Sequence, residues 1–165
     1  MASALVLALS FTGCKKDGEV GPSGPAGSNG VDGNANVKLF YFGPDTMTTT
    51  TTWKTHVFDS TITENMIDSS LVLIYHENSG FWYPSPGLGI AGSYQTRSYT
   101  YGTPTQASLS IQIYNADGST YTGAQQIFTR IKVIIAPADI FTGRGMKIDT
   151  KDYYATMGYL GLSID

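Results

Sequence analysis

The chain has a single cysteine among its 165 residues, and this scarcity excludes two classes of small protein. One thiol cannot form an intramolecular disulfide framework, and it cannot supply the ligands of a cysteine-based zinc site. Charge is also sparse, because Asp, Glu, Lys and Arg together make up 14% of the residues. The ten basic residues are scattered rather than gathered in a stripe, so we expect no nucleic-acid partner.

Long apolar runs are missing as well. Beyond the first part of the chain, no run is long and apolar enough to span a bilayer. The early run from Ala4 to Phe11 is too short for a transmembrane helix but has the length of a signal-peptide core. Thr12 and Gly13 follow it, and small residues before Cys14 suit the cleft of a signal peptidase. We therefore expect a signal peptide that ends directly before Cys14.

The segment Phe11-Thr12-Gly13-Cys14 resembles the lipobox of bacterial lipoproteins. In that family the cysteine thiol receives diacylglycerol and becomes the mature N-terminus, so the resemblance implies lipidation of Cys14. One acyl chain holds a membrane weakly, whereas the several chains of a lipoprotein cysteine give stable anchoring. The alternative is a partly buried thiol in an N-terminal strand.

Four charged residues follow the cysteine closely. They are Lys15, Lys16, Asp17 and Glu19. Their pattern is similar to the short export signals of surface lipoproteins of the Bacteroidota. A solvated spacer is the equally good alternative.

Glycine then recurs at every third position from Gly18 to Ala35, through six triplets. These glycines are Gly18, Gly21, Gly24, Gly27, Gly30 and Gly33. A collagen triple helix requires this repeat, because only a hydrogen atom fits at the shared axis. Pro22 and Pro25 occupy the X position of their triplets, and no proline occupies the Y position. A triple helix of this length is therefore only marginally stable by itself. Two arrangements stay open: a short rod in a homotrimer, or a single extended tether on a monomer.

The order of lipobox, charged spacer, Gly-X-Y run and β-rich domain is similar to that of collagen-like repeat lipoproteins of the Bacteroidota. The resemblance implies a lipoprotein of a Gram-negative outer membrane, held at the cell surface by its lipid. It also implies a C-terminal β-domain of unassigned function. We expect three segments: a signal peptide at residues 1–13, a lipidated N-terminus with a collagen-like linker at 14–36, and a β-domain at 37–165.

The β-domain is expected to be an antiparallel, jelly-roll-like β-sandwich of seven to nine strands with a short C-terminal helix. The clearest strand is 107–114, where aliphatic and polar residues alternate. Another strand around 131–135 is expected to be half-buried, with Arg130 and Lys132 toward solvent. Further strands are expected at residues 37–42, 53–58, 71–75, 81–83 and 94–101.

Turn and helix signals divide these strands. Turns are expected at 76–80 and 115–118, the longest irregular loop at 84–92, and either a strand edge or a loop at 46–52. Thr61 and Glu64 match a capping box and predict one short helical turn. A second helix is expected from residue 151 to 157, with Asp149 or Thr150 as its N-cap and Gly158 as its C-cap.

Histidine is nearly as scarce as cysteine, and His56 and His76 are the two imidazoles. No Gly-x-Ser-x-Gly nucleophile elbow accompanies them, so we expect no catalytic residue and no enzyme. A secreted enzyme would need a cleft that joins one histidine to a carboxylate and a hydroxyl. Asn115, Asp117 and Ser119 alternate like the start of a calcium loop, but residues 120–126 supply no further acidic ligand and a hairpin tip is the simpler explanation. We expect no metal and no cofactor.

Aromatic residues carry the surface hypothesis. Trp82, Tyr83 and Tyr94 are the candidates for ligand contact, because exposed rings beside a rigid loop suit a sugar or a protein. The alternative places Trp82 in the sandwich core.

The expected function is the display of a non-catalytic interaction or structural module, for adhesion or assembly, by a membrane-anchored lipoprotein. One alternative is carbohydrate capture in a nutrient-uptake system, which requires coplanar exposed aromatics around residues 82–94. The other is a trimeric binding head on a collagen-like stalk, which requires a large apolar patch on one side of the head.

Overall fold

The computed structural model describes residues 36–138 and 149–164. The chain divides into two compact units, residues 1–30 and 31–165, and every described residue belongs to the second unit. The described part contains ten β-strands, two short α-helices and one 3-10 turn. The expected all-β fold is confirmed, with short strands added to the seven to nine that the sequence predicts.

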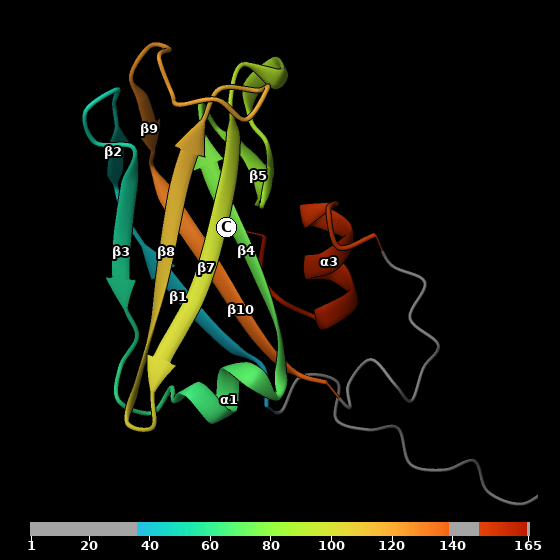
Figure 1. The fold of residues 1–165 in the computed structure, drawn as a ribbon. Helices are drawn as coiled ribbons and strands as arrows, with labels where there is room; N and C mark the ends of the chain where they lie inside the picture. Colours follow the sequence, from blue (N-terminus) through green and yellow to red (C-terminus); the bar gives the residue numbers. More distant parts are fainter. Residues whose placement is uncertain (1–35, 139–148, 165) are drawn as a thin grey trace, which may run out of the picture. The chain divides into compact units, whose positions relative to one another are not determined.

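Two four-stranded antiparallel sheets face each other (Figure 1). One contains, in spatial order, β1 (Lys38–Phe42), β10 (Arg130–Pro137), β4 (Ser70–Asn78) and β5 (Phe81–Ser85). The other contains β3 (Trp53–Val57), β8 (Gln106–Tyr114), β7 (Gln95–Thr103) and β6 (Gly87–Leu88). The short strands β2 (Asp45–Met47) and β9 (Gln126–Phe128) pair with each other. The arrangement is that of an antiparallel sandwich.

The main core lies between the two sheets, where alternating side chains from both sides meet. The inward residues of β8 are fully buried, as their alternation predicts: Ala107, Leu109, Ile111 and Ile113. They share one cluster with Ile131, Val133 and Ile135 of β10. The predicted strand at 107–114 is therefore confirmed in both position and facing.

Helix α3 (Tyr153–Leu160) packs on the outward side of β1, β10, β4 and β5, which we call the covered sheet (Figure 1). Tyr153, Met157 and Leu160 of the helix form a second core with Tyr75 and Ile134. Because both sides of this sheet are covered, its strands carry buried residues on both faces.

The expectation that the strand around 131–135 is half-buried is therefore wrong. Lys132 faces outward from the covered sheet, yet its side chain is fully buried under α3. Its ammonium lies about equally far from the ring centroids of Tyr41, Trp82 and Tyr153, at 5.1, 5.1 and 5.0 Å. The amine also donates a hydrogen bond of 2.6 Å to the Tyr153 hydroxyl. Cation–π contacts of this kind stabilise a charge that has been removed from water.

Helix α1 (Glu64–Asp68) begins where the sequence predicts a helical turn, but with a different cap. Thr63 Oγ1 accepts a hydrogen bond from Met66 N at 3.4 Å, and Thr61 is not the N-cap. Ile62 explains the shift, because its side chain is fully buried and its carbonyl accepts a 2.9 Å bond from Ala107 N. Burial and this bond hold Ile62 in the core, and the helix starts after Thr63, whose backbone is extended.

Helix α3 also starts later than the predicted span 151–157. Its N-cap is Asp152, whose Oδ1 accepts from Ala155 N at 3.0 Å. Asp149 instead closes the preceding turn, with its carboxylate accepting from Lys151 N at 2.9 Å. Gly158 lies within the helix, and the helix ends at Gly161, which adopts a left-handed conformation with φ of 64°.

Two predicted irregular segments are shorter than expected. β4 continues through residue 78, and Ser79 and Gly80, with φ of 54° and 81°, make the turn alone. The segment 84–92 contains the end of β5, all of β6 and the 3-10 turn Ile90–Gly92. Pro84 is tolerated because β5 is an edge strand, where a missing donor breaks no ladder. The threonine-rich segment 46–52 is strand up to Met47 and a bend after it.

Candidate functional site

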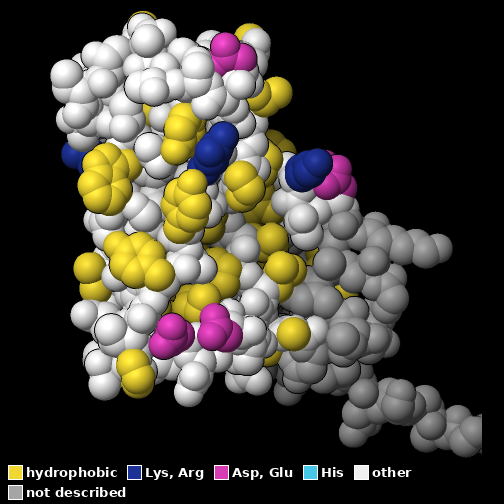
Figure 2. Space-filling model, viewed as in Figure 1, with side chains coloured by type: hydrophobic (Ala, Val, Ile, Leu, Met, Phe, Trp, Pro, Cys, Tyr) yellow, Lys and Arg dark blue, Asp and Glu magenta, His cyan; other side chains and the backbone are white. Residues whose placement is uncertain are grey.

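Large aromatic side chains stand in solvent on the outward side of the sheet formed by β3, β8, β7 and β6, which we call the open sheet. Trp53 is 62% exposed, Tyr99 48% and Tyr101 52%. Val57 and Leu88 are exposed on the same side. Figure 2 shows these hydrophobic side chains spread over this side of the molecule with a basic side chain among them. We call this surface, made by the outward residues of the open sheet, the aromatic face.

The register of the open sheet arranges the aromatic face in rows. Gln112 of the middle strand β8 pairs with Trp53 on one side and with Arg97 on the other. In the next row, Ser110 lies between Thr55 and Tyr99. The third row holds Val57, Ser108 and Tyr101. Trp53, Tyr99 and Tyr101 therefore lie on the two strands that flank Ser108 and Ser110 of β8.

Ser110 lies low on this face. It faces outward but is only 7% exposed. Its hydroxyl is 3.1 Å from that of Thr55 and donates to the Lys54 carbonyl at 3.3 Å. Two strand spacings separate β3 from β7, so their backbones are about 10 Å apart.

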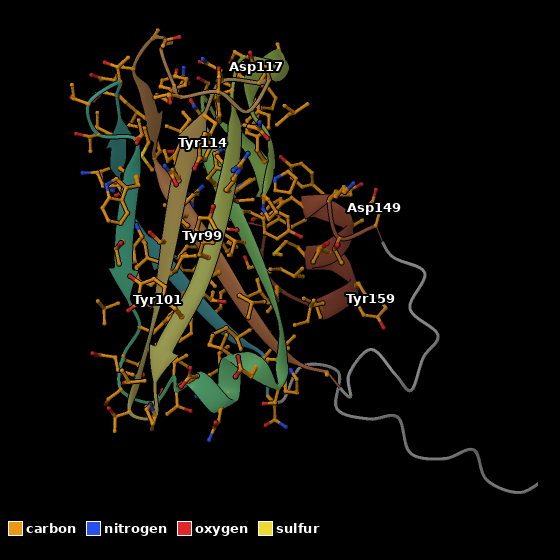
Figure 3. The ribbon with its side chains drawn as sticks, in the orientation of Figure 1. Tyr99, Tyr101, Tyr114, Asp117, Asp149 and Tyr159 are labelled. Carbon is orange, nitrogen blue, oxygen red and sulfur yellow. The ribbon has the colours of Figure 1, made fainter. Side chains whose placement is uncertain are left out.

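Arg97 is the cation of the aromatic face. Its guanidinium lies 4.3 Å from the centroid of the Tyr114 ring, which is adjacent on the same side. Figure 3 shows Tyr99, Tyr101 and Tyr114 along the two central strands of this face. Within residues 36–138 and 149–164, the ion pairs are His56–Asp45 and Arg130–Glu77, and neither involves Arg97. The carboxylate of Asp117, in the loop above, accepts hydrogen bonds from the Ser119 amide and hydroxyl at 2.9 and 2.6 Å.

The three residues predicted to contact a ligand do not form a common surface. The Trp82 ring stacks on Tyr153 of α3, with centroids 4.7 Å apart and planes 14° from parallel. It is partly buried against the second core, under α3, and not in the sandwich core where the alternative places it. Tyr83 faces the sandwich interior, with its ring centroid 5.6 Å from that of His76. Tyr94 is fully buried, so it offers no surface to a ligand.

Strand parity explains why the aromatic face was missed. Residues 94–101 are predicted as a strand with one wet side, and that prediction leaves open which side is wet. In the structure, Thr96 is buried, whereas Arg97, Tyr99 and Tyr101 are exposed. Tyr94 shares the parity of Thr96 and therefore points inward. The signal that was available is the repeat of large residues at positions 97, 99 and 101 of one strand.

His76 belongs to a buried polar cluster in the main core. Asn78 Nδ2 donates to the Tyr94 hydroxyl at 3.2 Å, and this hydroxyl lies 2.9 Å from His76 Nε2. The tautomer of His76 decides which of these two groups donates to the other. Burial lowers the pKa of His76 to about 3 and raises the pKa of Tyr94 to about 12. Both side chains are therefore uncharged at neutral pH and out of reach of a substrate.

His56 lies at the edge between β2 and β3. Its Nε2 is 2.7 Å from Asp45 Oδ2, and its ring stacks on Phe42 with centroids 4.6 Å apart. The contact joins the small β2–β9 sheet to the open sheet. Among the described hydrogen bonds, none joins a serine or threonine hydroxyl to this imidazole.

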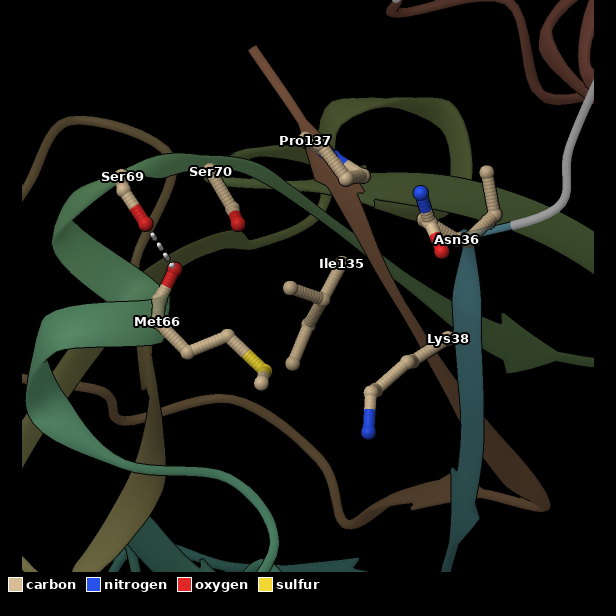
Figure 4. A pocket seen from close by; sticks show the side chains of 8 residues that line it. Asn36, Lys38, Met66, Ser69, Ser70, Ile135 and Pro137 are labelled. Carbon is tan, nitrogen blue, oxygen red and sulfur yellow. Dashed lines mark hydrogen bonds between the residues drawn. The ribbon is translucent and has the colours of Figure 1, made fainter.

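A cavity of about 340 Å³ lies between α1 and the adjacent ends of β1 and β10. Met66 and Ile135 give it an apolar floor, and Lys38 contributes an ammonium near its edge (Figure 4). Ser69 and Ser70 add hydroxyls, and Ser69 donates to the Met66 carbonyl at 3.3 Å. Neither histidine lines this cavity.

The Asn115–Gly118 turn is present, since Gly118 N donates to the Asn115 carbonyl at 2.9 Å. Among the described residues, no three His, Cys, Asp or Glu side chains converge as metal ligands. In the same part of the chain, none of the helices has the length and apolar character needed to cross a membrane.

The residues of the predicted anchor and stalk lie outside the described residues. They are Cys14, Lys15, Lys16, Asp17, Glu19 and the six repeat glycines from Gly18 to Gly33. Comparison of the chain with protein-family models, with curated proteins and with solved structures finds no match among any of them.

Proposed function

We propose that this protein is a lipid-anchored lipoprotein that displays a non-catalytic binding module, and that the aromatic face is its contact surface. The observation that carries the proposal is the exposure of Trp53, Tyr99 and Tyr101 on one side of one sheet. Exposed apolar clusters of this kind mark contact surfaces, and Trp, Tyr and Arg dominate the energetics of such surfaces. Nothing in the folding of the sandwich requires these rings, because the core lies on the other side of the strands.

The two histidines support a binding role over catalysis. His76 is buried and neutral, and the Nε2 of His56 is engaged by Asp45. A general base must reach a substrate proton, and neither imidazole lines the described cavity. The anchor rests on the lipobox-like segment before Cys14, and the glycine repeat would hold the head away from the membrane.

The test is adhesion of bacterial cells that carry the full chain. Cells of a Gram-negative host would be washed over surfaces coated with an acidic polysaccharide, a neutral polysaccharide or collagen. We expect retention on at least one coating by the wild type. The triple variant Trp53→Ala, Tyr99→Ala, Tyr101→Ala should lower retention by about tenfold or more, because each lost ring removes contact area. The variant Cys14→Ser should abolish retention, because the head is no longer attached to the cell.

The matched control is Tyr154→Ala, which removes a 54% exposed ring from α3 on the other sheet. Antibody binding to intact cells would show that equal amounts of protein reach the surface. If wild-type cells adhere to none of the coatings, or if the triple variant adheres as well as the wild type, the aromatic face is not a contact surface.

A further inference from the structure

The aromatic face combines three kinds of side chain that few ligands need together. The rings of Trp53 and Tyr99 lie on the two strands that flank β8, and Ser110 lies outward on β8. The amide of Gln112 lies in the row that joins Trp53 to Arg97. Rings suit the flat apolar side of a pyranose, and hydroxyl and amide groups suit its alcohols.

The charge of the aromatic face is opposite to that of the whole chain. The formal net charge is −3, yet the outward positions of β3, β7 and β8 contain Arg97 and no aspartate or glutamate. The Tyr114 ring holds the guanidinium at 4.3 Å, which orients a planar fork at the end of the Trp53 row. Arginine in this setting recognises a carboxylate or sulfate by two parallel hydrogen bonds.

We propose that the aromatic face binds an acidic glycan chain that lies along β8. Trp53 and Tyr99 stack on sugar rings, and Arg97 pairs with a carboxylate or sulfate substituent. This inference rests on the proposed function and names its ligand class. An acidic sugar satisfies the cation and the rings together, whereas a neutral glycan leaves Arg97 without its counter-charge.

The test is native electrophoresis of the soluble Cys14→Ser chain through gels that contain polygalacturonate, chondroitin sulfate or hydroxyethyl cellulose. We expect either acidic polymer to retard the protein and the neutral polymer to retard it about tenfold less. Arg97→Gln should weaken retardation by the acidic polymer about tenfold, and Trp53→Ala by a similar factor. Circular dichroism would show that both variants keep the native fold.

Two controls separate a built site from general electrostatics. Lys151→Gln removes the same charge from an exposed position next to α3, and Tyr154→Ala removes an exposed ring. Both should change retardation by less than about twofold. If Lys151→Gln and Arg97→Gln lose the same amount of retardation in the acidic gels, the proposal is overturned. It is also overturned if neither acidic gel retards the wild type.

The failure of this inference is distinguishable from failure of the proposed function. Retardation by hydroxyethyl cellulose alone, or adhesion to collagen alone, overturns the acidic ligand while the aromatic face remains a contact surface. If Trp53→Ala changes neither retardation nor adhesion, the contact surface itself is wrong.

Discussion

At the scale of the residue, buried polar groups in the main core couple its stability to pH. Burial holds the pKa of His76 at about 3, well below the 6.5 of an unfolded histidine. At a pH between these two values, His76 is protonated in the unfolded chain and neutral in the folded chain. The contribution of the neutral His76 to the free energy of unfolding is therefore fully present above pH 6.5, and it is lost as the pH falls toward 3.

This linkage gives a prediction for His76→Gln, which keeps a polar side chain beside Tyr94. From pH 7.0 to 5.5 the free energy of unfolding of the wild type should fall by about 1 kcal/mol more than that of the variant. Urea unfolding followed by circular dichroism measures both slopes. The lower end of this pH range lies above the pH at which ordinary carboxylates titrate. Equal slopes in the two proteins would mean that His76 is accessible to protons in the folded state.

At the scale of the element, α3 determines which outward side chains of the covered sheet are exposed to solvent. The helix has eight residues, too few to be stable alone, so its packing on Tyr75 and Ile134 and its cap maintain it. Its cover buries Lys132 and one side of Trp82. Without α3 the protein would expose apolar groups on both outward sides of the sandwich.

The cap provides a direct check. Asp152→Ala should lower the free energy of unfolding by about 1 kcal/mol, because the Ala155 amide loses its acceptor. Thr150→Ala, at a position that the sequence also predicts as a cap, should cost less than about 0.5 kcal/mol. Thermal unfolding of the two variants measures the difference. A larger effect at Thr150 would place the helix start earlier than the structure does.

At the scale of the whole molecule, the two outward sides of the sandwich differ in kind. The covered sheet has an apolar outward side with a helix on it, and the open sheet has rings separated by hydroxyl and amide side chains. A surface that must pack permanently against a second copy is more continuously apolar than this one. The aromatic face therefore suits a polar ligand better than a trimer contact.

We accordingly expect the chain from residue 14 onward, with Cys14→Ser, to have the mass of a monomer by light scattering. Six Gly-X-Y triplets without proline in the Y position give the stalk little tendency to trimerise alone. A mass of three chains would contradict this expectation and favour the triple-helical rod. The triple variant Trp53→Ala, Tyr99→Ala, Tyr101→Ala would then show whether the aromatic face holds the trimer together.

Local pattern alone was enough to predict much of the domain. The alternation at 107–114 determined both the strand β8 and its buried side, because a period of two has only one apolar set. The Asn115–Gly118 turn and the existence of both helices also follow from local chemistry. Their caps do not, since burial of Ile62 delays α1 and the turn at Asp149 precedes α3.

Only the tertiary structure decided which surfaces are covered. A strand pattern assigns residues to two sides but does not say which layer lies against each side, and that depends on elements distant in sequence. α3, from the end of the chain, turns Lys132 from an expected surface residue into a buried one. The open sheet has no such cover among the described residues, so Trp53, Tyr99 and Tyr101 reach solvent. Tyr94, by contrast, is fully buried in the core.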